Sequence, residues 1–216
     1  MKRNLPPEDF EKEYVNKVYD NIAPHFDHTR YKPWPPVLEF IQKLPPNSLL
    51  LDVGCGNGRN LCQNKQIFDM GTDFSFPLCE IANRQKRPIF AGSALNLPIR
   101  NNTFDSVICI AVIHHFASVQ RRELCLQEIC RILKPGGTAL VTAWAKKQPD
   151  KTYSEADQMI PWNVHPQFNK ESPHFERFYH FFDEGEFASL SQNIPNFKLI
   201  SDQWIKGNWH AIFQKE

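Results

Sequence analysis

The 216-residue chain lacks any apolar run that approaches the ~20 residues needed to span a bilayer. Residues 1–7 also lack the apolar segment of a secretory signal peptide. We therefore expect a cytoplasmic protein, with the nucleus as an alternative location and no membrane partner. Repeats and low-complexity tracts are absent as well, and a chain of this length is expected to fold as one domain, residues 1–216, around a single core.

Paired cysteines are missing too. The six cysteines include no C-x-x-C pair, and the eight histidines are dispersed along the chain. Zinc sites and disulfide frameworks both need a characteristic spacing of their ligands or thiols. We therefore expect reduced, mostly buried thiols and no dependence on a metal.

Neither sign of charge is in excess. The formal net charge is +1, which falls short of the strongly basic balance that is typical of nucleic-acid-binding domains. A nucleic-acid role must therefore depend on local patches, although each basic cluster taken alone is more typical of a solvated face. The candidate clusters are Arg84 with Lys86 and Arg87, Arg121 with Arg122, and Lys146 with Lys147 and Lys151.

Glycine is scarce, with nine residues in all, yet three glycines stand at alternate positions directly after an apolar stretch. Residues 49–53 predict a strand that carries Asp52 near its end, followed by a turn with Gly54, Gly56 and Gly58. Glycine accepts positive φ angles and lets the backbone pass close beneath a ligand. The pattern therefore predicts a cofactor-binding turn, with a simple strand-to-helix connection as the alternative.

A second acid supports the cofactor site. An apolar run over residues 67–70 leads to Asp73, which lies 21 residues after Asp52, and an acid at this spacing can accept hydrogen bonds from ribose hydroxyls. The dinucleotide pattern G-x-G-x-x-G is absent, and no Lys-Ser/Thr pair follows to make a phosphate loop. We therefore predict a nucleotide-type site in a Rossmann-like half, with a helix that begins near Arg59.

Predicted strands and helices alternate over much of the chain, which indicates a parallel sheet. The run over residues 104–113 is almost continuously apolar and suits a central strand covered on both faces. Residues from about 145 to 178 break the alternation, and a long irregular connection in a compact domain is usually functional, so we predict a substrate-side insertion there. The other predicted elements are helices over residues 10–26 (ending before Pro24), 37–44, 77–85, 118–133 and 184–190, and strands over residues 88–91, 138–144, 197–205 and 208–213.

The D-x-G-x-G-x-G turn resembles the first motif of the class I S-adenosylmethionine-dependent methyltransferases. That resemblance implies S-adenosylmethionine as the cofactor and an α/β fold, with a doubly wound, mostly parallel seven-stranded Rossmann-like sheet whose last strand is antiparallel. Further segments are similar to the eukaryotic tRNA wobble-uridine carboxymethyl methyltransferases over nearly the whole chain. They include residues 14–26 (YVNKVYDNIAPHF), 29–35 (TRYKPWP), 111–115 (AVIHH), 160–162 (IPW) and 177–180 (RFYH).

In that family the acceptor is the carboxylate of 5-carboxymethyluridine at the tRNA wobble position, and the product is its methyl ester. A carboxylate with a pKa near ~4 is ionised at neutral pH, so we expect residues that orient an anion and no general base. His115, Arg30 and Tyr31 are the candidates, because an arginine fork matches a carboxylate and His115 follows the fourth strand. For His115 a core histidine bonded to backbone is the alternative, and Arg30 could instead bind the methionine carboxylate of the cofactor.

The resemblance also implies the remaining contacts. Residues of the base pocket and substrate side are Trp144, Trp162 and Arg177, with packing as the alternative role of the two tryptophans. The implied cofactor contacts are Arg30, Asp52, Gly54, Cys55, Gly56, Gly58, Asp73, Phe74, Ser93, Ala94, Leu95, Ile110 and Ala111. Ser93 departs from the family pattern, which usually has an acid there, so the serine hydroxyl or the Ala94 amide is expected to serve the adenine with weaker charge assistance.

The implied partners are tRNA and a small zinc-binding methyltransferase activator subunit. The strand over residues 88–91 is expected at a free edge of the sheet, and an uncovered edge strand invites pairing with another chain. We expect the activator to pair there and to supply part of a basic surface for RNA.

Two other functions stay open from the sequence. A small-molecule methyltransferase of the quinone-biosynthesis kind shares the turn, but it would need an apolar lid, and residues 146–177 are polar. A catalytically silent cofactor-binding scaffold is the second alternative, although the intact Asp52, Asp73 and glycine turn argue against it.

Overall fold

The structure is a computed structural model that describes residues 5–168 and 174–216. The strands of the main sheet are β1 (Leu49–Val53), β2 (Phe68–Asp73), β3 (Ile89–Ala91), β4 (Phe104–Ile110), β5 (Leu133–Trp144), β8 (Phe197–Ile205) and β9 (Asn208–Lys215). The helices are α1 (Pro7–Glu11), the π-helical turn η1 (Lys12–Asn16), α2 (Lys17–Thr29), α3 (Pro35–Gln42), α4 (Phe76–Arg84), the 3-10 turn η2 (Ile113–His115), α5 (Val119–Ile132) and α6 (Glu186–Ser191).

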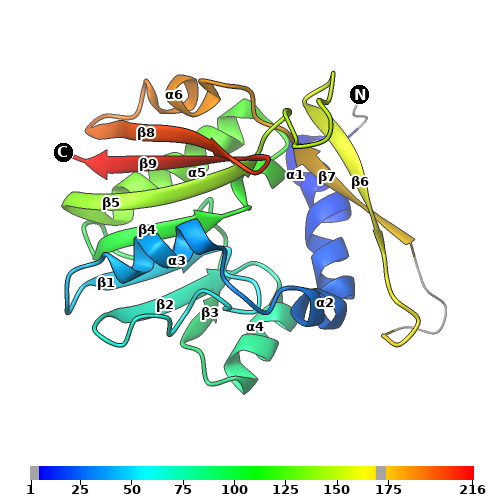
Figure 1. Cartoon of the computed structure of the whole chain (residues 1–216), viewed down its shortest axis with the longest axis horizontal. Helices are drawn as coiled ribbons and strands as arrows, with labels where there is room; N and C mark the ends of the chain where they lie inside the picture. Colours follow the sequence, from blue (N-terminus) through cyan, green and yellow to red (C-terminus); the bar gives the residue numbers. More distant parts are fainter. Residues whose placement is uncertain (1–4, 169–173) are drawn as a thin grey trace.

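The sheet has the strand order β3-β2-β1-β4-β5-β9-β8 (Figure 1). The first five strands in this order run parallel, and β9 runs antiparallel to both of its neighbours. The predicted doubly wound α/β fold with an antiparallel last strand is therefore confirmed.

Successive side chains of the central strands pack into two separate hydrophobic cores, because they point alternately to the two faces of the sheet. Leu50 faces α3 and packs in a cluster with Val37 and Ile41. Leu51, the next residue, faces the opposite side and belongs to the large core that α5 and α6 cover. The sheet is thus buried on both faces, which explains the near-continuous apolar run of β4.

The prediction of a helix near Arg59 is wrong. Residues 58–62 form successive turns instead. Cys62 has a positive φ of 61°, and its backbone N–H donates to the Asp69 carboxylate at 2.7 Å. A residue in the left-handed region cannot continue an α-helix, so the chain returns directly to β2.

The N-terminal helix does not end before Pro24 as predicted, because α2 continues through this proline to Thr29. A proline inside a helix removes one backbone hydrogen bond. Ile22 and Ala23 are almost completely buried next to it, and Ile22 packs with Trp162 and Val164 from a distant segment. Tertiary packing of this face therefore outweighs the local cost.

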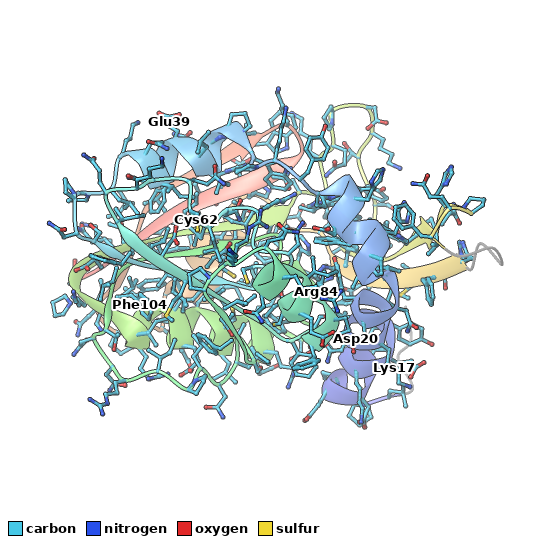
Figure 2. All side chains as sticks on the ribbon, turned by 90° about the horizontal axis from the view of Figure 1, so that it is seen from below. Lys17, Asp20, Glu39, Cys62, Arg84 and Phe104 are labelled. Atoms are coloured by element: carbon cyan, nitrogen blue, oxygen red, sulfur yellow. The ribbon has the colours of Figure 1, made fainter. Side chains whose placement is uncertain are left out.

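The predicted insertion contains two strands, β6 (Asp157–Asn163) and β7 (His174–His180), which pair antiparallel in a separate small sheet. Together with α2 this hairpin stands across the carboxyl ends of the parallel strands (Figure 1). Helix α2 also packs beside α4. Figure 2, a view from below, marks the two helices by the labelled residues Asp20 on α2 and Arg84 on α4. Over the described residues, no helix has the length and apolar content that a bilayer-spanning helix needs.

Candidate active site

A cavity lies between the carboxyl ends of β1, β2 and β4 on one side and α2 and β7 on the other. Open α/β sheets bind their ligands at this edge. The cavity brings together most of the predicted site residues, from eight separate segments of the chain. They are Arg30, Gly54, Cys55, Gly56, Asp73, Phe74, Ser93, Ala94, Leu95, Ile110, Ala111, His115, Trp144 and Arg177.

The glycine turn follows β1 and is tied to the end of β2 by Asp73. One carboxylate oxygen of Asp73 accepts from the Gly56 N–H at 2.7 Å, and the other accepts from the Ser75 N–H at 2.8 Å. Burial raises the pKa of Asp73 to about 6, against the lowering effect of these two backbone hydrogen bonds. Asp73 is thus a carboxylate held in the cavity with its remaining lone pairs available to hydroxyl donors.

The turn is compact because glycine occupies its tight positions. Gly54 has a φ of 72°, and a Cβ built there would lie 2.3 Å from Cγ2 of Val112. A Cβ on Gly56, where φ is 56°, would lie 3.1 Å from the Phe26 ring. The backbone can therefore form one wall of the cavity without side chains, which suits an adenosyl group lying against it. Gly58 faces away from the cavity, toward Arg87 and Ala82.

The expectation that both acids face the cofactor needs correction for Asp52. Its side chain is fully buried and does not line the cavity. One carboxylate oxygen accepts from Asn60 Nδ2 at 3.1 Å, and the other has no hydrogen-bond partner among the described residues. Asp52 therefore lies beneath the turn and acts on it through Asn60.

Burial raises the pKa of Asp52 to about 7, while Asn60 and Arg59 lower it and Asp73 and Asp69 raise it. Because its folded-state pKa lies above the ordinary value, Asp52 binds more proton in the folded protein than in the unfolded chain between about pH 4 and 7, so its contribution to stability falls as the pH rises through this window. We expect the ligand-free Asp52→Asn variant to be more stable than the wild type above pH 7 by a few kcal/mol, at about 1.4 kcal/mol per pKa unit. Urea unfolding of both proteins at pH 5 and pH 8 measures this difference, which should grow toward pH 8; a difference that stays the same or shrinks over this range would contradict it.

Four of the described arginines line the cavity, and one of them, Arg121, is paired with Glu11 at 2.7 Å. The other three are Arg30, Arg59 and Arg177. Among the described residues, none of the three forms an ion pair with a carboxylate. Charged side chains are rarely buried without a partner. The cavity therefore carries excess positive charge that suits anionic ligands.

Arg177, on β7, is the most deeply buried of these arginines, with 5% of its surface exposed. Its guanidinium carbon lies 4.4 Å from the Trp162 ring centroid and 5.2 Å from that of Tyr179. Nη1 donates to the Tyr19 hydroxyl at 3.4 Å, and Nε has no partner among the described residues. Stacked aromatic rings thus hold a planar cation whose donors are largely unused.

Trp162 does not itself line the cavity, in contrast to its predicted place in the base pocket. Only 8% of Trp162 is exposed, and its indole N–H donates to His25 Nδ1 at 3.1 Å. The Trp162 ring packs against the Arg177 guanidinium, and of these two residues only Arg177 lines the cavity. Trp144 does line the cavity, with its ring 4.8 Å from that of Tyr179.

His115 uses both ring nitrogens. Nδ1 lies 2.7 Å from the Phe178 carbonyl oxygen, which only accepts, so Nδ1 carries the proton. Nε2 therefore accepts from the Tyr19 hydroxyl at 2.9 Å. Burial lowers the pKa of His115 to about 3, so the ring is neutral. It positions Tyr19, which in turn accepts from Arg177.

The structure does not place Tyr31 with Arg30 and His115, and this prediction needs correction. The Tyr31 side chain is 70% exposed and lies outside the cavity, in a shallow hollow beside it that Arg87 also lines. The backbone turns after Thr29, where α2 ends, so Arg30 lines the cavity and Tyr31 lines the neighbouring hollow.

Sequence reasoning assigned no role to Arg59 and Tyr19. Arg59 was expected at the start of a helix, and its contact with the Trp34 ring at 5.5 Å arises from the turn that replaces this helix. Tyr19 lies within the quoted segment over residues 14–26, but only the distant His115 and Arg177 reveal its role.

Comparison with known proteins agrees with this geometry. A family model described as "Methyltransferase domain" matches residues 51–141. A tRNA (carboxymethyluridine(34)-5-O)-methyltransferase of Schizosaccharomyces pombe is 36% identical to the chain, and the alignment covers 96% of this chain and 98% of the relative. This chain belongs to the tRNA carboxymethyluridine methyltransferase family. The family resemblance seen in the sequence is therefore confirmed.

Other members of the family are longer. The tRNA (carboxymethyluridine(34)-5-O)-methyltransferase of Xenopus tropicalis is 34% identical, with 95% of this chain but 41% of the relative in the alignment. The chain thus spans about two fifths of the length of this curated relative.

Solved structures share the fold. The 1,6-didemethyltoxoflavin-N1-methyltransferase of Burkholderia thailandensis, solved with S-adenosylhomocysteine, has a TM-score of 0.68 and 18% identity, covering 100% of this chain and 92% of that chain. The methyltransferase in complex with the Haloferax volcanii Trm112 activator has a TM-score of 0.66 and 14% identity, covering 94% and 98%. At these identities the likeness shows the fold alone.

Proposed function

We propose that this chain transfers the methyl group of S-adenosylmethionine to the side-chain carboxylate of 5-carboxymethyluridine at the wobble position of tRNA, forming a methyl ester. Family membership supports the substrate. The observation that carries the proposal is Arg177, a buried guanidinium in the cavity that no described carboxylate neutralises. An acceptor that brings its own carboxylate would supply the missing anion and match the arginine fork.

The residues present fit the proposed cofactor. Asp73 would accept from the ribose hydroxyls, and Ser93 with Ala94 would lie at the adenine. Arg30 and Arg59 are the two cavity cations available to the methionine carboxylate. When bound, the cofactor supplies an electrophilic methyl group on a sulfonium.

The acceptor side of the cavity needs no general base. A carboxylate with a pKa near ~4 is already ionised at neutral pH, so its oxygen can form the new bond to carbon without losing a proton. The neutral His115, with both nitrogens engaged, is not available to take one. Arg177 would hold the carboxylate, and Trp144 and Tyr179 would flank the base. Catalysis would then rest mainly on orientation.

We further propose a heterodimer with a small zinc-binding activator subunit. The complex of a Trm112 activator with a methyltransferase of the same fold supports the pairing. Among the strands that the structure describes, the edge strand β3 pairs only with β2, so its outer backbone groups can accept another strand. Co-expression should raise the yield of soluble, active protein. A chain that is fully active and monodisperse alone would contradict the pairing.

Nucleoside mass analysis tests the proposed function. tRNA containing 5-carboxymethyluridine is incubated with the chain, its activator and S-adenosylmethionine labelled in the methyl group, then digested. A labelled methyl ester of 5-carboxymethyluridine is the expected product. Label on any other nucleoside, or none, would contradict the assignment.

His115→Ala should lower the turnover number for tRNA about tenfold, because Tyr19 loses its acceptor and Arg177 loses a fixed neighbour. The dissociation constant of S-adenosylmethionine should stay nearly unchanged, since His115 contacts neither Asp73 nor the glycine turn. Steady-state kinetics and calorimetry measure the two quantities separately. A loss of cofactor binding with normal turnover at saturation would remove His115 from the acceptor side.

A further inference from the structure

Three lysines lie over aromatic rings in the loops next to the cavity. The Lys32 ammonium is 5.6 Å from the ring centroid of Tyr31, that of Lys151 is 4.5 Å from Tyr153, and that of Lys147 is 5.7 Å from Trp204. We call these six residues the rim pairs. None of the three lysines forms an ion pair with a carboxylate in the part of the chain that the structure describes.

The first rim pair continues directly from the cavity wall. Tyr31 and Lys32 lie between Arg30 and Trp34, both of which line the cavity. The hollow that holds Tyr31 is also lined by Asn57, which lines the cavity as well. The Tyr31 ring is therefore beside the cavity opening and 70% exposed.

The second rim pair is joined to the cavity by contacting rings, and the third is held beside it by a hydrogen bond. The Tyr153 ring lies 4.4 Å from that of Phe181, which is stacked on Trp144 with an interplanar angle of 3° and a centroid distance of 5.8 Å. Trp144 lines the cavity. Trp204 is 37% exposed, and its indole N–H donates to the Lys147 carbonyl, which fixes the tip of the β8–β9 hairpin against this loop.

All three rim pairs lie at the carboxyl end of the parallel strands. Figure 1 shows there the loop after β5 beside the β8–β9 turn, with the loop after α2 below them. The pKa of Lys151 is raised first by its hydrogen bond to the Tyr153 hydroxyl and also by the charge of Asp150. No acid forms an ion pair with a rim lysine among the described residues. Asp183 is paired with Lys146, and Asp27 accepts from Asn57 and Gln85. The opening is thus bordered by the exposed rings of Tyr31 and Trp204, each next to a lysine that has no carboxylate partner among the described residues.

We infer that the rim pairs bind the nucleotides that flank the target base in a single-stranded RNA loop. Exposed rings next to cations suit single-stranded RNA, because bases stack on aromatic faces and lysines contact the phosphates between them. A chain with a net charge of +1 needs such local cations to bind RNA at all. This inference rests on the proposed function for the base that enters the cavity.

The test is binding of a fluorescently labelled anticodon stem-loop RNA to the full chain with its activator, followed by anisotropy. Tyr31→Ala should weaken binding about tenfold, and Tyr31→Phe, which keeps the ring, should restore it. The double variant Lys147→Glu with Lys151→Glu should weaken binding by at least tenfold and reduce its dependence on salt. Lys65→Glu is the matched control, because Lys65 is exposed and precedes β2 at the opposite end of the sheet.

Calorimetry with S-adenosylmethionine should give wild-type affinity for all of these variants, which verifies their folding. Equal RNA binding by the wild type, Tyr31→Ala and the double lysine variant would overturn the inference, as would a wild type that binds no RNA. The proposed function fails separately, if the wild type binds the RNA through the rim pairs but forms no methyl ester.

Discussion

Arg177→Met should reduce kcat/KM for methyl transfer to tRNA by 100-fold or more, with no loss of S-adenosylmethionine affinity. The guanidinium would make two charge-assisted hydrogen bonds to the acceptor carboxylate, and hydrogen bonds to charged groups contribute about 1.5–3 kcal/mol each. Methionine keeps the length of the side chain and packs against the rings of Trp162 and Tyr179. Steady-state kinetics with tRNA and calorimetry with the cofactor measure the two effects.

The melting temperature of Arg177→Met shows whether a loss of activity arises from unfolding. Because the substitution removes a buried charge that has no described carboxylate partner, the melting temperature should stay the same or rise. Arg177→Lys should be intermediate in activity, since lysine keeps the charge without the fork. Arg100→Met, at an exposed position before β4, should change nothing. Wild-type kinetics for Arg177→Met would remove this residue from the acceptor site.

Asp73→Asn should weaken S-adenosylmethionine binding by 100-fold or more. The carboxylate accepts from Gly56 and Ser75 with both oxygens, so an amide NH₂ must face one of these donors. The variant loses charge-assisted bonds to the ribose and also the tie between the glycine turn and β2. Isothermal calorimetry measures the affinity.

Asp69→Asn is the matched control for this second variant. Asp69 lies on the same strand and also accepts from a backbone N–H, that of Cys62, but it does not line the cavity. Its substitution should leave cofactor affinity within about twofold of the wild type. Equal losses for both variants would indicate a general effect on β2 rather than a cofactor contact at Asp73.

The fold could be predicted from the sequence because, in most elements, the hydrophobic periodicity favours the same structure as the tertiary packing. The apolar run of β4 and the antiparallel tail follow from periodicity and turn residues, and the structure confirms these strands. The strand predicted over residues 138–144 begins earlier, since β5 already starts at Leu133, and the run predicted over 104–113 leaves the strand after Ile110. The predicted helix end before Pro24 and the predicted helix start near Arg59 were wrong because tertiary contacts there outweigh the local sequence pattern. Burial of Ile22 continues α2 through the proline, and the capping of Cys62 by Asp69 replaces a helix with turns.

The site was predictable where a residue is fixed by its position at a strand end. Asp73 is the last residue of β2, His115 comes shortly after β4, and both line the cavity. Tyr31 and Trp162 were harder to place, since the direction of a side chain in a loop or hairpin depends on distant contacts. Trp162 turns toward His25 and Arg177, and Tyr31 turns outward. Asp52 lies on β1, two residues before the cavity residue Gly54, but it points beneath the turn, toward Asn60.

The central claim is that the cavity receives an anionic acceptor through Arg177. The most direct test compares two anticodon stem-loops that differ only at the target uridine, one with a 5-carboxymethyl group and one with the neutral 5-carbamoylmethyl group, as acceptors of labelled methyl. The account predicts an ester on the carboxylate and no transfer to the amide by the wild type, with transfer to the carboxylate lost in Arg177→Met. Comparable transfer to both stem-loops, or to the carboxylate without Arg177, would contradict it.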